Sequence, residues 1–115
     1  MNLRINGQEL RFRVGKEELE SLCVGETLKQ STHLTNNKIL ETCITTNYTG
    51  SGMSISNEND NFTLYVNKGL AAKFLDSLPS KEGLEATQKI NDEQFLTLIL
   101  EVDIRTQKRK KIAEE

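Results

Sequence analysis

Apolar and polar residues alternate in two short segments near the start of the chain. These are Leu3-Arg4-Ile5 and Leu10-Arg11-Phe12-Arg13-Val14, and strict alternation is typical of strands with one buried face. Asn6-Gly7 between them suits a two-residue type I′ turn, because both central residues of that turn need positive φ. The pattern therefore predicts a hairpin in which Leu3 faces Leu10 and Arg4 faces Glu9.

Helical spacing replaces alternation after this hairpin. Gly15 can serve as the N-cap of a short helix from Lys16, whose apolar stripe is Leu19, Leu22 and Cys23, and Gly25 is a natural stop. Residues 27–34 and 39–48 are then rich in Thr and branched side chains, which favours two strands separated by a polar turn at 35–38.

The same succession of patterns returns after Gly50-Ser51-Gly52. Residues 53–55 and 62–66 alternate, and Asn67 can cap a helix that ends before Pro79. A weak strand is expected at 84–90 and a strong one at 95–104. The unbroken apolar run Leu98-Ile99-Leu100 requires cover on both faces, so the last strand should be central in its sheet.

Placed at an offset of 52 residues, the two halves of the chain overlie one another, with Val14 over Val66 and Leu22 over Phe74. We therefore expect one α+β domain over 1–104 with internal duplication, its halves covering about 1–49 and 53–104. Each half is strand, strand, helix, strand, strand. The halves should pack around a pseudo-twofold axis as a small, mainly antiparallel β-barrel or sandwich with two short helices. The alternative is an open sheet with both helices on one side.

Charge divides the chain into an acidic body and a basic end. The net charge is −2, but residues 105–115 contain five Lys or Arg and two Glu, which leaves −5 for the first 104 positions. An acidic body argues against broad binding of a phosphate backbone. The charged tail 105–115 is almost without apolar residues, so we expect it to project from the domain.

Composition restricts the environment of the protein. The sequence shows neither the apolar run of a secretory leader nor a stretch long enough to span a membrane, so we expect a cytoplasmic protein. Cys23 and Cys43 lie twenty residues apart with no Cys-x-x-Cys unit, which makes a disulfide the minority interpretation. Aromatic residues make up only 5% of the chain, so platforms for stacking bases or sugars are scarce.

Candidate chemistry is sparse. The most suggestive surface feature is the basic face of the first hairpin, where Arg4, Arg11 and Arg13 could hold a phosphate or an acidic partner. Ordinary pairing with Glu9 and nearby acids is the competing explanation, and we favour it. Glu101 and Asp103 could form an acid/base pair near the end of the last strand, but solvated or salt-bridged carboxylates are commoner.

The remaining chemical residues have plainer explanations. His33 is the only histidine and has no ligand spacing around it, so a structural or surface role is favoured over a metal site. Cys23 and Cys43 fit as small buried hydrophobes. Gly50-Ser51-Gly52 is not followed by Gly-Lys-Ser/Thr or by a helix, so it is interpreted as a linker and not a phosphate loop. We predict no cofactor and no metal site.

Several of these segments resemble an uncharacterised family of small bacterial proteins, mostly from Bacteroidetes. The resemblance rests on residues 3–5, 10–20, 32–34 and 66–74 and on the closing strand 98–104, and so covers nearly the whole chain. This sequence has Asn67 where the family tends to have Pro, Phe74 in place of Trp, and a basic instead of an acidic tail. The family is a domain of unknown function, so the resemblance transfers no site residues. In pattern alone, the repeated unit also resembles swapped-hairpin barrels such as AbrB-type DNA-binding domains.

Three classes of function remain open. Small size and duplicated architecture favour a noncatalytic binding or interaction module, whose partner would be another protein or a second copy. A small nucleic-acid-binding domain would use Arg4, Arg11, Arg13 and the basic tail, against the acidic body. An enzyme would use Glu101 or Asp103. No membrane partner is expected.

Overall fold

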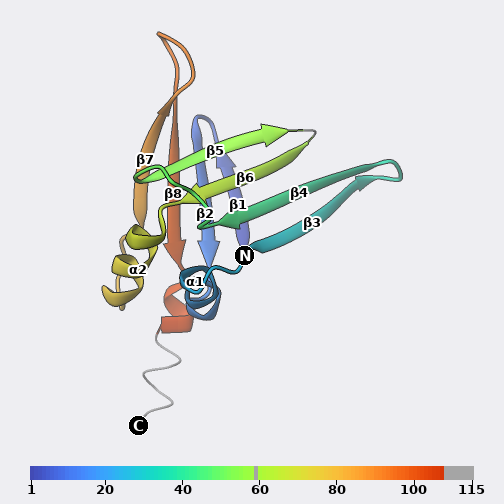
Figure 1. Ribbon diagram of the computed structural model, residues 1–115. Helices are drawn as coiled ribbons and strands as arrows, with labels where there is room; N and C mark the ends of the chain where they lie inside the picture. Colours follow the sequence, from blue (N-terminus) through green and yellow to red (C-terminus); the bar gives the residue numbers. More distant parts are fainter. Residues whose placement is uncertain (59, 108–115) are drawn as a thin grey trace.

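The computed structural model describes residues 1–58 and 60–107, which form two four-stranded sheets and two α-helices (Figure 1). The strands are β1 (Asn2–Asn6), β2 (Glu9–Val14), β3 (Leu28–Thr35), β4 (Lys38–Thr45), β5 (Met53–Glu58), β6 (Asn61–Val66), β7 (Leu84–Lys89) and β8 (Phe95–Val102). The helices are α1 (Lys16–Cys23) and α2 (Lys68–Asp76). The predicted α+β class with two packed sheets is confirmed, and the sheets do not close into a barrel within the described residues.

Each sheet combines one hairpin from the first half of the chain with one from the second. Sheet A has the order β1-β2-β8-β7, and sheet B has the order β3-β4-β6-β5. The inner strands are parallel neighbours, β2 beside β8 and β4 beside β6, while every hairpin is antiparallel. The last strand is therefore central, as its apolar run predicts, and Leu98, Ile99 and Leu100 are all buried.

The first hairpin has a different register from the predicted one. Leu3 lies opposite Phe12 and Asn6 opposite Glu9, so the predicted pairing of Leu3 with Leu10 is wrong by two residues. The turn consists of Gly7 and Gln8, and only Gly7 has positive φ, at 57°. A two-residue turn with glycine first is typical of type II′, not of the predicted type I′. A shift of two residues leaves every side chain on its predicted face.

The registers of the two halves correspond strand by strand. Leu3 opposite Phe12 in β1 and β2 matches Ile55 opposite Leu64 in β5 and β6, a spacing of 52 residues in both strands. Leu28 opposite Ile44 in β3 and β4 matches Leu84 opposite Leu100 in β7 and β8, a spacing of 56. The longer spacing places the additional residues between α2 and β7.

The core lies between the two sheets and is closed at one end by the helices. Its fully buried large side chains are Phe12, Leu19, Leu22, Ile44, Leu64, Leu98, Leu100, Val14 and Val66. Helix α1 buries Leu19 and Leu22, and α2 buries Ala71 and Phe74 at positions 52 residues later. The predicted burial of both Val14 and Val66, and of both Leu22 and Phe74, is confirmed.

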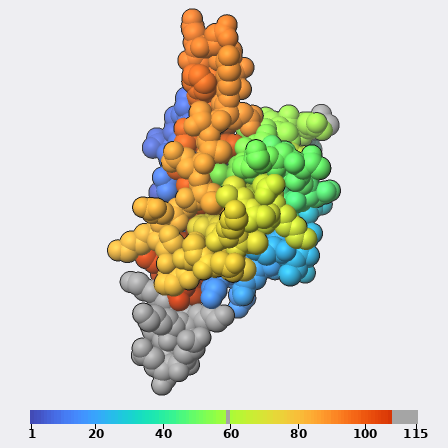
Figure 2. Space-filling view, turned by 60° about the vertical axis from the view of Figure 1, so that its left-hand side comes forward, coloured from blue at the N-terminus to red at the C-terminus, as the bar shows by residue number. Residues whose placement is uncertain are grey.

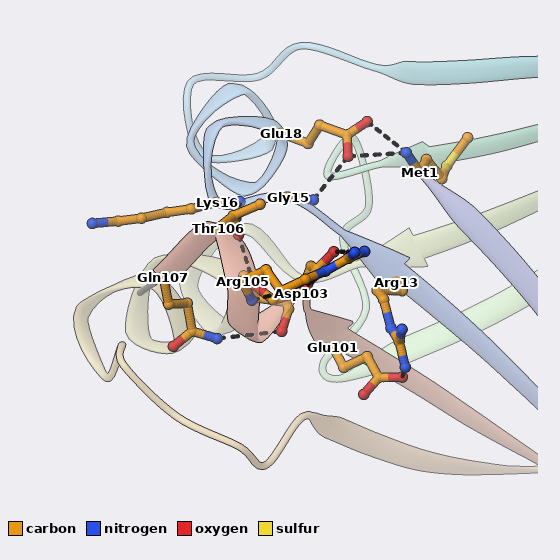
Figure 3. A network of polar contacts seen from close by, with 11 residues as sticks. Met1, Arg13, Gly15, Lys16, Glu18, Glu101, Asp103, Arg105, Thr106 and Gln107 are labelled. Carbon is orange, nitrogen blue, oxygen red and sulfur yellow. Dashed lines mark hydrogen bonds and ion pairs between the residues drawn. The ribbon is translucent and has the colours of Figure 1, made fainter. Parts of the chain in front are cut away.

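The helices begin at the predicted caps, by different means. The backbone N–H of Gly15 donates to the Glu18 carboxylate at 2.8 Å, and the same carboxylate accepts from the Met1 ammonium at 3.0 Å (Figure 3). In α2 the side-chain oxygen of Asn67 accepts from the backbone N–H of Leu70 at 3.0 Å. Both arrangements satisfy donors that the first turn of a helix leaves unpaired.

The segment after β8 corrects the predicted course of the tail. Residues 104–107 form a helical turn, and Gln107 is buried. The Gln107 side chain bonds both backbone groups of Ser80 and the carbonyl of Val102, while Thr106 accepts from the Lys16 N–H (Figure 3). The expected projection from residue 105 is therefore wrong up to Gln107, because polar side chains can dock through backbone hydrogen bonds without apolar area. The predicted tail residues 108–115 lie outside the described residues.

Candidate functional site

Ion pairs neutralise most of the basic face of the first hairpin. Arg4, Arg11 and Arg13 lie on the face of sheet A opposite the core. Glu101 of β8 lies 3.4 Å from Arg11 and 3.6 Å from Arg13, and Glu9 lies 3.5 Å from Arg11. The hydrogen bond to Glu101 is the main cause that raises the pKa of Arg11. The favoured interpretation, pairing with Glu9 and nearby acids, thus holds for Arg11 and Arg13.

The two candidate acids, Glu101 on β8 and Asp103 directly after it, each lie against a guanidinium. Glu101 forms ion pairs with Arg11 and Arg13. The Asp103 carboxylate accepts from the backbone N–H and the guanidinium of Arg105 at 2.9 to 3.3 Å (Figure 3). The side-chain hydrogen bond from Arg105 is the first cause that lowers the pKa of Asp103. A carboxylate with a lowered pKa stays ionised at neutral pH, which is poorly suited to general acid catalysis.

The cysteines and the histidine lie on separate elements. Cys43 is buried on β4, and burial, followed by the charge of Glu41, raises the pKa of its thiol. Cys23 at the end of α1 is half-buried, and its thiol pKa is raised first by burial and next by Asp76. Both thiols are free, and His33 is exposed on β3. Raised thiol pKa values disfavour the nucleophilic thiolate.

The glycine-rich loop is tied to the start of α2. The side chain of Asn67 donates to the carbonyl of Gly50 at 2.9 Å, and its backbone N–H donates to the carbonyl of Gly52 at 2.9 Å. Gly52 has φ of 78°, which favours glycine. The loop leads into β5 and not into a helix, and so connects the first half of the chain to the second.

The side chain of Gln88, which the sequence analysis missed, joins the two sheets along one side. We name the line where β5 of sheet B meets β7 of sheet A the closed seam. Gln88 of β7 accepts from the backbone N–H of Ile55 at 2.9 Å and donates to its carbonyl at 3.2 Å, and it accepts from Ser54 at 3.1 Å. Its carboxamide thus fills the outward hydrogen bonds of Ile55 on β5.

The corresponding line between β1 and β3 differs, and we name it the open seam. At the spacings of 52 and 56 residues, Ile55 corresponds to Leu3 and Gln88 to Thr32. The described residues form no such side-chain bridge there, and β3 runs away from β1 in Figure 1. Residues 29–35 of β3 are all exposed, Ile5 is 62% exposed and Leu34 is 56% exposed. Two exposed strand edges therefore border this side of the sandwich.

Comparison with known proteins places the chain in a family. A family model described as "Family of unknown function (DUF7009)" matches residues 1–115. The chain belongs to the DUF7009 family. No curated protein and no solved structure matches it. The resemblance to a domain of unknown function is confirmed, while its occurrence in Bacteroidetes stays a prediction.

The described part of this DUF7009 chain lacks two further features that would indicate a function. Within residues 1–58 and 60–107, no three His, Cys, Asp or Glu side chains cluster as metal ligands would. Of the described helices, none is long and apolar enough to cross a membrane. The β7–β8 hairpin, whose end stands out in Figure 2, exposes Ile90 and Phe95, each about half, beside the ion pair of Lys89 and Asp92.

Proposed function

We propose that this chain is a noncatalytic protein-interaction module and that the open seam is its binding surface. One observation carries the proposal: two strand edges of corresponding position differ, since β5 is bonded at Ile55 by Gln88, whereas β1 has no such side-chain bridge among the described residues and carries the exposed Ile5. An exposed strand edge with nearby apolar side chains is a ready template for another chain. If no partner bound at the open seam, covering its strand edge with a side chain would stabilise the domain, as Gln88 covers Ile55 at the closed seam.

We also propose that the two halves arose by duplication within one domain. The matched registers support this, as do the corresponding burial positions in α1 and α2. Neither half pairs its own inner strands with each other, so each half depends on the other for both sheets. On this proposal the open seam is the side on which the two copies have diverged.

The other two classes of function receive less support from the contacts. Arg11 and Arg13 share Glu101, so less of their charge is available to a phosphate backbone. Glu101 and Asp103 both pair with guanidinium groups, Glu101 on the outer face of sheet A and Asp103 directly after the end of β8. The interaction role uses surface that such pairs do not already occupy.

A site-specific crosslink in the native host tests the proposed function. A photo-reactive amino acid replaces Thr32, which is exposed on β3 at the open seam. The matched control carries the same group at Thr87, which is exposed on β7 facing away from the core. Irradiation of cells, followed by mass spectrometry of the adducts, is expected to yield a protein adduct at Thr32 that is absent or much weaker at Thr87.

The crosslinking results at Thr32 and Thr87 either support or contradict the open seam as a binding surface. A discrete protein adduct at Thr32 supports the interaction role and identifies the partner. No adduct at Thr32, or equal adducts at both positions in cells that express the folded protein, would count against the open seam as a binding surface. Folding of both variants is checked by circular dichroism and by their melting temperatures.

A further inference from the structure

We infer that the open seam binds an extended acidic and apolar segment of a partner protein, which adds to β1 as a further strand. The inference rests on the proposed interaction function and states the chemistry of the partner.

At the closed seam, the outward backbone groups of one β5 residue are bonded by a side chain of β7. The carboxamide of Gln88 accepts from the N–H of Ile55 and donates to its carbonyl. A neighbouring β-strand makes the same pair of bonds with one residue of an edge strand. The Gln88 side chain therefore stands in for the peptide group of an added strand.

The edge of β1 presents the corresponding groups without such a partner. Leu3 corresponds to Ile55 in the register, so its N–H and carbonyl point away from β2. The turn gives the same result. Asn6 and Glu9, which flank the two-residue turn, exchange hydrogen bonds, and bonded and non-bonded pairs alternate along the ladder. Leu3 and Ile5 are therefore in non-bonded pairs and point their backbone groups away from β2. Thr32 takes the place of Gln88, and its side chain is too short to repeat the bridge.

The charges beside the open seam select the partner's chemistry. Six strand residues are cationic, and Arg11, Arg13, Lys38 and Lys89 each form an ion pair. The other two are Arg4 on β1 and Lys29 on β3, and neither pairs with a described residue. Strands β1 and β3 contain no Asp or Glu.

Side-chain alternation then assigns the order of residues in the partner. Arg4 and Lys29 lie on the faces turned away from the core, whereas Leu3, Ile5 and Leu28 lie on the inward faces. A strand added to β1 would direct every second side chain to the outer face of sheet A, where Arg4 lies, and the others inward, toward Leu3 and Ile5. Carboxylates alternating with apolar residues match both sets.

A second copy of the chain fits this surface less well. Antiparallel pairing of β1 with its own copy would bring two Arg4 side chains onto one face of the joined sheet, and like charges so placed are destabilising. The edge of β5 is already bonded by Gln88. A partner segment with carboxylates would place opposite charges beside Arg4 and would not need the edge of β5.

Binding of short synthetic peptides to the full chain tests the inference. One peptide alternates glutamate with valine, a second replaces glutamate by lysine, and a third repeats the first with alternate backbone amides N-methylated. At low salt we expect the glutamate peptide to bind roughly tenfold more tightly than the lysine peptide, a preference that salt reduces. N-methylation should abolish binding, since it removes the donors that the edge of β1 requires.

Variants and amide exchange locate the bound peptide. The pair Arg4→Glu and Lys29→Glu should reverse the preference between the two peptides, whereas the control Lys89→Glu, on another hairpin, should not. Thr32→Gln, which copies the closed seam, should weaken binding of the glutamate peptide by about tenfold, because the new side chain competes for Leu3. Bound peptide should slow hydrogen exchange at the amides of Leu3 and Ile5.

Equal affinity for both charged peptides, binding that survives N-methylation, or slowed exchange at other strands would each overturn strand addition at β1. So would dimerisation of the peptide-free chain through β1 in sedimentation analysis. If the Thr32 crosslink finds a partner while the glutamate peptide fails to bind, the interaction function stands and this inference fails. If the crosslink fails as well, both are rejected.

Discussion

The closed seam and the open seam occupy corresponding places in the two halves, but they differ in how the strand edges are satisfied. At the closed seam, β5 and β7 contact each other and Gln88 completes the hydrogen bonds of Ile55. At the open seam the corresponding residue is Thr32, and β3 is exposed from residue 29 to 35. The lesson is that one long amide side chain can decide whether a sandwich is sealed along an edge.

Truncation of a core side chain should lower the free energy of unfolding more than any other change. Comparing one core position from each half shows whether the core is equally well packed under the open and the closed seam. Phe12 and Leu64 occupy corresponding strand positions and are both fully buried. We expect Phe12→Ala to lower the free energy of unfolding by about 3–5 kcal/mol and Leu64→Ala by about 2–5 kcal/mol. Chemical denaturation measures both. A cost below about 1 kcal/mol for either would show that the core under that seam is loosely packed.

Removal of the bridge tests the closed seam itself. Gln88→Ala leaves the N–H and carbonyl of partly buried Ile55 without their partners, so we expect a loss of about 1–3 kcal/mol in the free energy of unfolding. Thr32→Ala at the open seam is the matched control and should change it by no more than about 0.5 kcal/mol. Equal effects of the two substitutions would remove the distinction between the seams.

The helix caps compare the halves on a smaller scale. Asn67→Ala removes a side-chain acceptor from α2 and its bond to Gly50, and should cost about 0.5–2 kcal/mol in thermal or chemical unfolding. In α1 the acceptor is Glu18, and Glu18→Gln keeps a side-chain oxygen for Gly15 and Met1 while removing the charge from their partly exposed partner, so a smaller loss is expected. A larger loss at Glu18 than at Asn67 would reverse this ranking of the caps.

The smallest expected effect concerns acid stability near the end of β8. Because Arg105 lowers the pKa of Asp103 below its ordinary value of 3.8, ionised Asp103 stabilises the fold above pH 3.8. That contribution is lost as the pH falls through the lowered pKa. Asp103→Asn should therefore lower stability at neutral pH and flatten the loss of stability in acid. Melting temperatures between neutral pH and pH 3 test this, and unchanged acid dependence would contradict it.

Alternation and helix spacing predict most of the local structure because each depends on neighbouring residues. The hairpins, both helix caps and the central position of the last strand follow from such patterns, and they are confirmed. The register of the first hairpin was wrong because Gly7 can begin or end a two-residue turn, and only the strand pairing decides between them. Strands β4 and β8 also end earlier than predicted, at Thr45 and Val102.

The contacts that distinguish the candidate surface could not be predicted in this way. Gln88 and Gln107 act through hydrogen bonds to backbone groups remote in sequence, and neither residue belongs to a pattern that marks such a bond. Pairing of Arg11 and Arg13 with Glu101 depends on the parallel contact between β2 and β8, which no local spacing indicates. The basic face was correctly located, whereas its acidic partner in β8 was not.

Exchange of hairpins between the halves also has a consequence for synthesis on the ribosome. Leu10 pairs with Leu98, so β2 gains its inner neighbour only after residue 98 has left the exit tunnel. Strand β4 can pair with β6 somewhat sooner. Until then the nascent chain carries unpaired strands with apolar faces, and such long-range pairing slows folding. Cellular factors that shield extended apolar segments should therefore have longer access to the first half than to the second.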